Sequence, residues 1–335
     1  MNLLSLQTNL PQSALQFRAI SYQGLQPGPR LLVTGAVHGN ETCGTRGILQ
    51  TIAQIDAQQI NILRGSVTFV PITNPKAFQL KQRMGDRNLN RNLTPTENPI
   101  EFEDLIANWL CPLMKQHDYL LDLHSFHTGG QPFAMVGPQD NAGTLEPFTR
   151  SKDEEAFALC LGVNRFVDGW LGTYASGVAR RVAQRGTGGD RTNVINTDPR
   201  YGVGTTEFMR SVGGSAITLE CGQHDDPQSP QVAWQAIQNT LAHLGLVDAP
   251  APKAVVKREM LSLYDVIDKV HADDQFSKAW ASFDPIKKGD VIGTPHGGAP
   301  IVASEDGFIV FPNPKAQPGQ EWFYLAHATN RLAAR

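Results

Sequence analysis

The chain has 335 residues, of which 41% are hydrophobic and 18% are charged, a composition typical of a folded globular protein and unlike a disordered chain or a coiled coil. This length predicts about two domains, with a core that needs no disulfide or metal to hold it. The 29 basic and 32 acidic side chains give a net charge of −3, which supplies no positive field for a phosphate backbone. We therefore expect no nucleic-acid partner.

Cysteine usage and the first residues bear on the cellular location. The four cysteines are widely spaced and form no C-x-x-C pair, which argues against a disulfide framework and against a thiolate zinc site. The first residues lack the cationic start and apolar core of a signal peptide, and no apolar stretch approaches the roughly 18 residues of a membrane span. We expect a cytoplasmic protein with reduced thiols and no membrane partner.

Short apolar runs bounded by turn residues predict buried strands in the first two thirds of the chain. These runs cover residues 30–37, 67–73, 119–123 and 216–221. Apolar residues spaced by three and four predict helices at residues 44–55, 101–116, 153–161 and 231–244. Because strands alternate with helices, we expect an α/β fold.

A stretch rich in proline and alanine, VDAPAPKA at residues 247–254, is typical of a linker. It predicts a larger domain at residues 1–246 and a smaller one at residues 255–335. The smaller part holds several short β-like runs separated by Gly, Pro and Asn turns, so we expect a mostly β module. These runs cover residues 291–293, 301–303, 308–311 and 322–326.

The sequence LLVTGAVHGNETCG places His38 and Glu41 just after the first predicted strand, with Gly35 and Gly39 allowing a tight turn. Open α/β sheets bind ligands at the carboxyl ends of their strands. An imidazole nitrogen and a carboxylate oxygen at this spacing can reach one zinc ion. The alternative is a surface turn in which His and Glu occur by chance.

A third metal ligand is expected at the end of another strand, and the run YLLDLHS supplies His124. Asp122 precedes it by two residues, so in a strand both side chains lie on one face, where the carboxylate can orient the ring. His127 competes for the ligand role. It lies three residues further into the loop, where a histidine more often meets substrate or solvent.

Between these ligands lies a polar segment, NPKAFQLKQRMGDRNLNRNL, whose polar residues include Asn74, Arg83, Asp86, Asn90 and Arg91. It has too few apolar residues for a core element, so we expect a loop. Arginine presents a planar fork of donors that suits a carboxylate, which favours an anionic ligand. The alternative is a solvated basic surface loop.

The run SAITLECGQH predicts a buried strand that ends in Glu220. A carboxylate in such a place needs a partner, a metal or a function to offset its desolvation. Beside a metal-activated water it can act as a general base. The alternatives are a structural pair with an arginine such as Arg210, or a thiol nucleophile at Cys221, although the Cys221 side chain should point to the opposite face.

Taken in order, HGNE, NPKAFQLKQRMGDRNLNR, DLHS and LECG resemble the succinylglutamate desuccinylase and aspartoacylase family of zinc hydrolases, which are relatives of the zinc carboxypeptidases. The resemblance covers roughly residues 31–222. It implies a mixed sheet flanked by helices, with a zinc-hydrolase catalytic domain at residues 1–246 followed by a smaller β module.

The resemblance also implies roles for individual residues. One zinc ion would be held by His38, Glu41 and His124, with Glu220 as the general base. Arg83 would polarise the scissile carbonyl and stabilise the oxyanion.

Three further residues would bind carboxylate groups of the substrate. Asn90 and Arg91 take one carboxylate, and Arg210 matches the additional carboxylate-binding arginine of the family. The partner implied is a small anionic N-acyl amino acid. A homo-oligomer is also possible, since members of the family often assemble.

The function implied is a zinc-dependent deacylase that cleaves the amide bond of a small, carboxylate-bearing N-acyl amino acid through a zinc-activated water. Ser125 and Asn88 depart from the pattern of aspartoacylases, which argues against N-acetylaspartate as the substrate. Tyr324 is the candidate for the tyrosine that the β module contributes in the family. The alternatives are a metallocarboxypeptidase acting on peptides and a non-catalytic zinc-bound ligand-binding protein.

Overall fold

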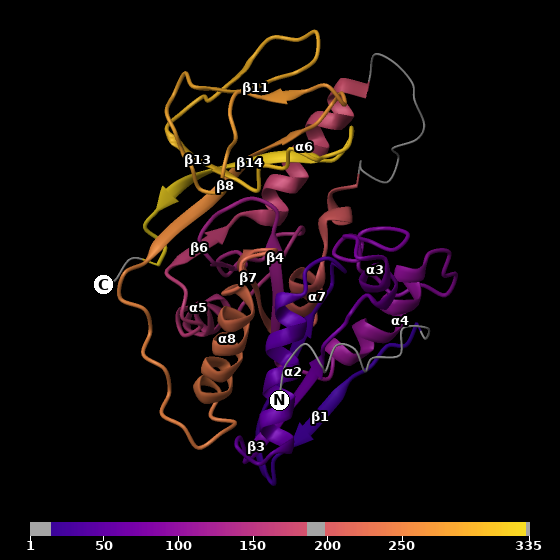
Figure 1. The fold of residues 1–335 in the computed structure, drawn as a ribbon, viewed down its shortest axis with the longest axis vertical. Coiled ribbons are helices and arrows are strands. Elements are labelled where there is room, and N and C mark those ends of the chain that lie inside the picture. The colour runs from indigo at the N-terminus through magenta and orange to yellow at the C-terminus, as the bar shows by residue number, and fades with distance from the viewer. Residues whose placement is uncertain (1–14, 186–197, 333–335) are drawn as a thin grey trace.

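The computed structural model describes residues 15–185 and 198–332, and its main element is a mixed sheet of 11 strands in the order β1-β3-β2-β4-β7-β5-β6-β8-β14-β13-β10. Figure 1 shows the earlier strands and their helices in the lower part of the view and the later strands above them. A second sheet has three antiparallel strands in the order β12-β11-β9. This architecture confirms the predicted α/β fold and its smaller, mostly β carboxyl-terminal part.

The strands of the large sheet are β1 (Ile20–Gln23), β2 (Gln26–Gly35), β3 (Arg64–Val70), β4 (Tyr119–Phe126), β5 (Phe133–Met135), β6 (Arg165–Asp168), β7 (Ser215–Gln223), β8 (Glu259–Asp268), β10 (Pro285–Ile286), β13 (Gly307–Val310) and β14 (Glu321–Thr329). Those of the small sheet are β9 (Gln275–Phe276), β11 (Val291–Thr294) and β12 (Ile301–Val302). The helices are α2 (Cys43–Asp56), α3 (Pro75–Leu80), α4 (Phe102–Met114), α5 (Ser151–Leu159), α6 (Trp170–Arg185), α7 (Thr205–Ser211) and α8 (Ser229–His243), with a 3₁₀ turn η2 (Pro199–Gly202).

Alternating side chains on the central strands build two cores on opposite faces of the sheet. In β2, Leu31 and Val33 pack with α2, α5 and α8, whereas Leu32 packs with α4 and α7. Successive side chains of a strand point to opposite faces, so a central strand must be apolar on both. This explains why the predicted central strands are continuous apolar runs.

Each predicted strand and helix corresponds to an element of the structure, but several elements were not predicted, among them the long helix α6 and the strand β8. In α6, Gly172 and Gly177 lower the intrinsic helix propensity, and packing against β8 supplies the missing stability. In β8, Glu259, Asp265 and Asp268 interrupt the apolar pattern. Tertiary contacts therefore decide both elements.

The carboxyl-terminal strands continue the large sheet. Strand β8 pairs in parallel with β6, from Arg165 opposite Glu259 to Asp168 opposite Ser262. Residues 247–254, the predicted linker, lie between α8 and β8 and belong to neither a helix nor a strand. The division into domains at this linker stays a prediction, since one sheet runs through both parts.

None of the helices within residues 15–185 and 198–332 has the length and apolar character needed to cross a bilayer.

Candidate metal centre and active site

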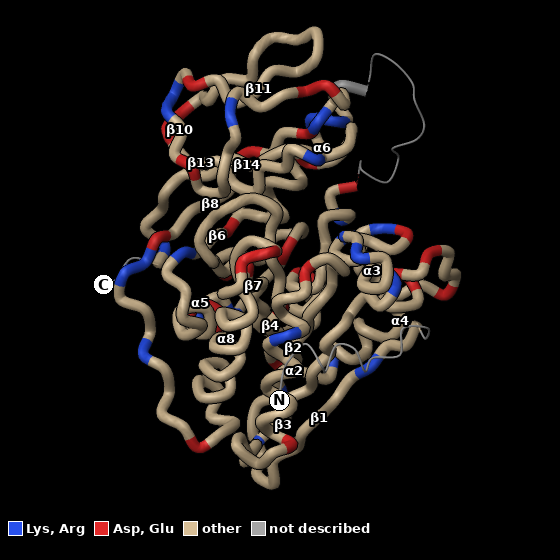
Figure 2. The backbone as a smooth tube through the Cα atoms, viewed as in Figure 1, with Lys and Arg blue, Asp and Glu red and all other residues tan. Residues whose placement is uncertain are grey.

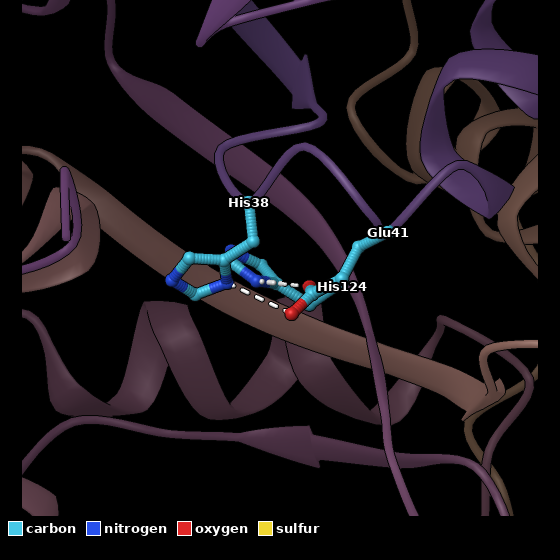
Figure 3. A group of neighbouring side chains, drawn as sticks. All are labelled: His38, Glu41 and His124. Atoms are coloured by element: carbon cyan, nitrogen blue, oxygen red, sulfur yellow. Dashed lines mark hydrogen bonds and ion pairs between the residues drawn. The ribbon is translucent and has the colours of Figure 1, made fainter. Parts of the chain in front are cut away.

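Two neighbouring strand ends bring His38, Glu41 and His124 together (Figure 3). His38 and Glu41 lie in the turn that follows β2, and His124 lies near the carboxyl end of β4, which pairs with β2 in parallel. The turn passes so close to α3 that a Cβ atom at Gly39 would lie 2.0 Å from the Ala77 carbonyl carbon. Only glycine fits there, and it allows the two ligand candidates to fold back over the sheet edge.

The three side chains converge through the Glu41 carboxylate. Its Oε1 lies 2.9 Å from His38 Nδ1, and its Oε2 lies 2.9 Å from His124 Nδ1. One donor atom from each residue lies within 4.8 Å of the others, and no more than 2% of any of the three residues is exposed. The interactions are drawn in Figure 3.

Asn88 determines which nitrogen of His38 carries a proton. Its Oδ1 lies 2.9 Å from His38 Nε2 and also accepts a hydrogen bond from the Asn90 backbone N–H, which identifies that atom as the amide oxygen. Nε2 of His38 therefore donates to Asn88. Nδ1 is left with a lone pair that faces Glu41, and it has no hydrogen-bond partner among the described residues despite the short distance.

Asp122 orients His124 as predicted. Its Oδ2 lies 2.8 Å from His124 Nε2, so that nitrogen donates and Nδ1 faces Glu41. Thr34 and Thr205 donate hydroxyl hydrogen bonds to the two oxygens of Asp122. These bonds fix the carboxylate, and through it the imidazole ring.

This arrangement fits a divalent cation. Two imidazole nitrogens and one carboxylate oxygen are the donor set of a catalytic zinc site with three protein ligands. The unpartnered lone pair of His38 Nδ1 faces a carboxylate oxygen in a buried place, and a cation between them removes that repulsion. Each ring is held from behind by an oxygen acceptor, Asn88 for one and Asp122 for the other.

The buried charges shift one another's pKa values. Burial lowers the pKa of His38 to about 4, with Arg83 adding to the effect. Burial alone lowers the pKa of His124 too, but Asp122 and Glu41 outweigh it and raise that pKa well above its ordinary value. Burial raises the pKa of Glu41, but the two histidines bring it well below the usual range. A carboxylate held ionised against imidazoles suits metal binding.

Glu220 lies on β7 directly opposite His124 of β4 in the parallel pairing. It is 7% exposed, and its Oε2 has no hydrogen-bond partner among the described residues. Burial and the nearby Glu41 raise its pKa to about 8. No hydrogen bond or ion pair joins it to Arg210 in the described chain, so the structural pairing that the sequence left open is absent there.

Cys221 points away from this site. It lies in the core beside α2 and α8, is 1% exposed, and has a pKa raised well above the ordinary value by burial. A thiolate nucleophile is disfavoured there, because burial penalises the charged form.

The arginine segment between β3 and α4 is held by the fully buried Glu103 of α4. Glu103 accepts hydrogen bonds from the backbone N–H groups of Gly85, Asp86 and Arg87 and from the Asn74 side chain. Asn74 has a structural place as the N-cap of α3, and Asp86 pairs with Lys76. The segment that was predicted to be a loop thus contains the short helix α3. The residues after this helix are held in place by the Glu103 carboxylate.

Arg83 and Arg91 lie on the wall of the cavity beside the metal centre, and each contacts a carboxylate of the protein. Arg83 Nη1 donates to Glu41 Oε1 over 3.0 Å, with 37% of its side chain exposed. Arg91 Nη2 donates to Glu321 Oε1 of β14 over 3.1 Å. The Arg91 guanidinium also lies over the ring of Trp170, 4.8 Å from its centroid.

Asn90 also lines the cavity, but its Oδ1 accepts hydrogen bonds from the backbone N–H and hydroxyl of Thr205 at the start of α7. A Cβ atom at Gly204 would lie 2.0 Å from that oxygen. The amide oxygen of Asn90 therefore anchors α7, and only its NH₂ group is left for a ligand.

The cavity has a volume of about 880 Å³ and extends from the metal centre to the carboxyl-terminal strands. Its wall combines the ends of β4 and β7 with the start of α6 and with Glu321 and Tyr324 of β14. It is large enough for a small organic molecule, whose reacting group would meet Glu220 and the three converging side chains.

Residues 27–147 match the family model of the succinylglutamate desuccinylase/aspartoacylase catalytic domain. This part of the chain, just over a third of its length, is thus similar to the catalytic domain of the succinylglutamate desuccinylase/aspartoacylase family. The match spans the turn that holds His38 and Glu41, the arginine segment and the strand that holds His124. No curated protein matches the chain in sequence.

Several solved structures have a similar fold. A succinylglutamate desuccinylase/aspartoacylase from Rhodobacter sphaeroides has a TM-score of 0.67 at 16% identity, covering 93% of this chain and 89% of that one. The product-bound ectoine utilization protein EutE (DoeB) from Ruegeria pomeroyi has a TM-score of 0.67 at 19% identity, covering 92% and 88%. The succinylglutamate desuccinylase from Vibrio parahaemolyticus has a TM-score of 0.66 at 18% identity, covering 92% and 86%.

Arg210, the expected counterpart of the family's additional carboxylate-binding arginine, is already engaged by the protein. Its guanidinium contacts Glu154, Glu146 and Glu207 at 3.0, 2.8 and 3.4 Å, and it donates to the Ala216 carbonyl oxygen. It is 5% exposed. These contacts give Arg210 a structural role in the cavity wall. They leave few of its N–H groups free to bind a substrate.

His224 lies near the candidate site and was not singled out from the sequence. His224 Nδ1 lies 2.8 Å from the Ser125 hydroxyl, and its ring lies edge-on to that of His127, with centroids 4.6 Å apart. Burial lowers the pKa of His127 to about 4, so both rings near this rim favour the neutral form. His224 follows Glu220 by four residues, and only the bend after β7 turns it toward the site.

Tyr324, the candidate tyrosine of the β module, lines the cavity from β14. Its hydroxyl is buried and has no hydrogen-bond partner among the described residues. A buried hydroxyl usually has a partner, so this one is available to a ligand.

Proposed function

We propose that this protein is a zinc-dependent deacylase that hydrolyses the amide bond of a small, carboxylate-bearing N-acyl amino acid. The observation that carries the proposal is the buried cluster of His38, Glu41 and His124 with the unpartnered Glu220 beside it, opening into one cavity. The match of residues 27–147 to the succinylglutamate desuccinylase/aspartoacylase catalytic domain supports the same class of reaction.

The metal would be held by His38, Glu41 and His124, and when bound it supplies a Lewis acid that polarises the acyl carbonyl and lowers the pKa of a water. Glu220 accepts a proton from the attacking water through its free Oε2. The hydroxyl adds to the acyl carbon, and the Arg83 guanidinium donates to the oxygen on which negative charge develops. Glu220 then returns its proton to the nitrogen as the C–N bond breaks, releasing the carboxylic acid and the free amine.

Arg91, Asn90 and Arg210 are proposed to recognise substrate carboxylates to different extents. Arg91 is the strongest candidate, because Glu321 is the one acidic side chain within residues 15–185 and 198–332 that pairs with it. Asn90 contributes its NH₂ group. Arg210 contributes least, because three glutamates already neutralise it.

The proposed setting is the cytoplasm. All four cysteines are free thiols, as is usual in a reducing compartment and unusual among secreted proteins.

The proposal is tested by measuring amine release from N-acetyl, N-succinyl and N-formyl amino acids, with dipeptides as competitors, on protein of known zinc content. We expect about one tightly bound zinc per chain at the triad and release that a chelator abolishes. Glu220→Gln should keep the zinc and lower kcat by roughly 10²–10⁴-fold. Cys221→Ser is the matched control, since the neighbouring side chain faces the core, and it should keep kcat within a small factor.

Faster cleavage of dipeptides than of N-acyl amino acids would replace the proposal by a carboxypeptidase. Zinc binding with no amine release from any substrate, and no effect of Glu220→Gln, would favour a non-catalytic ligand-binding protein. Absence of zinc binding at the triad would contradict the proposed metal centre itself.

A further inference from the structure

A second group of metal-binding side chains lies on the surface of the carboxyl-terminal part, in a different place from the cavity. His271 and Asp273 lie in the loop after β8, and His296 lies in the turn after β11. One donor atom from each residue lies within 4.8 Å of the others, and all three are exposed. None of them lines the cavity of the proposed active site.

The two imidazole rings lie face to face. Their centroids are 4.3 Å apart and their planes differ by 18°. His271 Nδ1 accepts a hydrogen bond from the Asp273 backbone N–H over 3.2 Å, and the Asp273 carboxylate lies 3.5 Å from the same nitrogen.

A buried aspartate holds the two loops in place. Asp274 is 6% exposed, and its Oδ2 accepts hydrogen bonds from the backbone N–H groups of Val270 and His271 at 2.7 and 2.9 Å. Its Oδ1 accepts from the His296 backbone N–H at 2.8 Å. Because one carboxylate bridges both loops, the two histidines are positioned relative to each other before any ligand arrives.

The turn that carries His296 is itself well defined. Gly298 N–H donates to the Pro295 carbonyl oxygen, and Gly297 has a φ of +67°, as the third residue of a type II turn requires. His296 therefore occupies the second position of a tight turn.

We infer that His271, His296 and Asp273 form a second, exchangeable binding site for a first-row divalent cation that prefers imidazole, such as Zn²⁺, Ni²⁺ or Cu²⁺. Two imidazoles and a carboxylate match the ligand preferences of these ions and not those of Mg²⁺ or Ca²⁺, which prefer oxygen ligands. With the side chains of His271 and Asp273 being 51% and 67% exposed, the ion exchanges freely with solvent. The site is independent of the proposed function, because it shares no residue with the triad.

The test is zinc titration of the full-length protein by calorimetry, with zinc content checked by elemental analysis. We expect two equivalents of zinc per chain, one tight and one weaker. The double variant His271→Ala/His296→Ala should lose the weaker equivalent and keep the amine-release activity. His327→Ala is the matched control: His327 is exposed on the same part of the chain and lies 3.4 Å from Glu305, but it has no second histidine beside it, so the variant should keep both equivalents.

Addition of Cu²⁺ gives an independent readout, since the electron paramagnetic resonance spectrum of the weaker site should show nitrogen couplings that disappear in the double variant. A weaker equivalent that persists in the double variant, or a wild-type chain that takes up zinc only at the triad, would overturn the inference. Failure of this inference can be told apart from failure of the proposed function. Wild type and double variant should differ by one equivalent of zinc, and that difference does not depend on whether the triad binds zinc.

Discussion

At the scale of single residues, two buried atoms without partners define the candidate centre. His38 Nδ1 faces a carboxylate oxygen and Glu220 Oε2 faces the cavity, and neither finds a hydrogen bond in the described chain. Buried polar atoms without partners are rare because they lose the solvation of water without replacement. Two of them on residues that line one cavity are more consistent with a bound cation and a reacting molecule than with a structural role.

Substitutions at Asn88 test the proposed role of His38 Nδ1 in metal binding. Because its amide oxygen keeps the proton of His38 on Nε2, Asn88→Ala should release the ring and weaken zinc binding by roughly 10–100-fold. Asn88→Asp keeps an oxygen acceptor in the same place and should retain most of the affinity. Competition with a chromophoric chelator measures both, and equal loss in the two variants would contradict the orienting role.

A substitution at Glu321 tests whether Arg91 binds a substrate carboxylate. It neutralises Arg91 from β14, so Glu321→Gln should leave a buried guanidinium that gains more from a substrate carboxylate. We expect KM for an N-acyl amino acid to fall by roughly tenfold, equivalent to about 1.4 kcal/mol. The matching amino acid amide, which lacks the carboxylate, should show no gain. A similar fall for both substrates would assign the effect to something other than charge.

At the scale of elements, the candidate centre results from three adjacent parallel strands that end at one edge. The order β2-β4-β7 places the turn after β2 beside His124 and places Glu220 opposite it. Side chains at the carboxyl ends of parallel strands meet there because the strands run in one direction. The helices contribute indirectly, since α4 holds the arginine segment through Glu103 and α7 starts from Thr205, which contacts Asp122.

Arg210 connects α7 to the strand and loop around it, and its loss should appear as instability. Arg210→Ala leaves Glu154 and Glu207 buried without their cation, and we expect the free energy of unfolding to fall by about 3–5 kcal/mol. Urea unfolding followed by circular dichroism measures the change. Unchanged stability combined with a raised KM would instead restore the carboxylate-binding role that the family resemblance implies.

At the scale of the whole molecule, the cavity depends on the two parts of the chain forming one sheet. Residues of β6 and β8, including Val167, Leu261 and Leu263, share a buried core, and β14 supplies Glu321 and Tyr324 to the cavity wall. Figure 2 shows basic and acidic positions interspersed along both parts of the described chain. Apolar burial and strand pairing supply most of the attachment between the two parts.

A cut in the linker tests this continuity. A specific protease site placed between Asp248 and Lys253 should be cleaved, because this stretch is mostly exposed and has no regular structure. We expect the two fragments to stay associated in size-exclusion chromatography and to separate only in denaturant. Separation under native conditions would show that residues 255–335 form an independent domain.

Acid should destabilise the whole molecule below about pH 4. Hydrogen bonds from Arg30 hold the pKa of Asp118 below its ordinary value, and the backbone N–H groups around Asp274 outweigh burial to lower its pKa as well. The folded protein keeps both carboxylates ionised where the unfolded chain takes up protons, so this stabilisation is complete above the unfolded pKa and is lost as the pH falls through the folded values. Thermal melts between pH 3 and pH 6 measure the slope, which should be shallower for Asp118→Asn and unchanged for the exposed control Asp225→Asn.

The sequence by itself determined the central strands, the four helices that cover them and the residues of the candidate centre. This was possible because strands buried on both faces are continuous apolar runs, and because a histidine or glutamate that ends such a run stands out. His124 and Glu220 were found in this way, and His38 and Glu41 were found by their spacing just after such a run. Asp122 was placed behind His124 by the two-residue period of a strand.

Only the tertiary structure decided which of the polar residues are free. Arg91 and Arg210 look alike in the sequence, but one meets a single glutamate from β14 and the other meets three from separate segments. Their partners lie 56 to 230 residues away, apart from Glu207 within α7, and no local pattern encodes contacts of that range. The continuation of the sheet through β8, and the pairing of His271 with His296, depend on long-range packing in the same way.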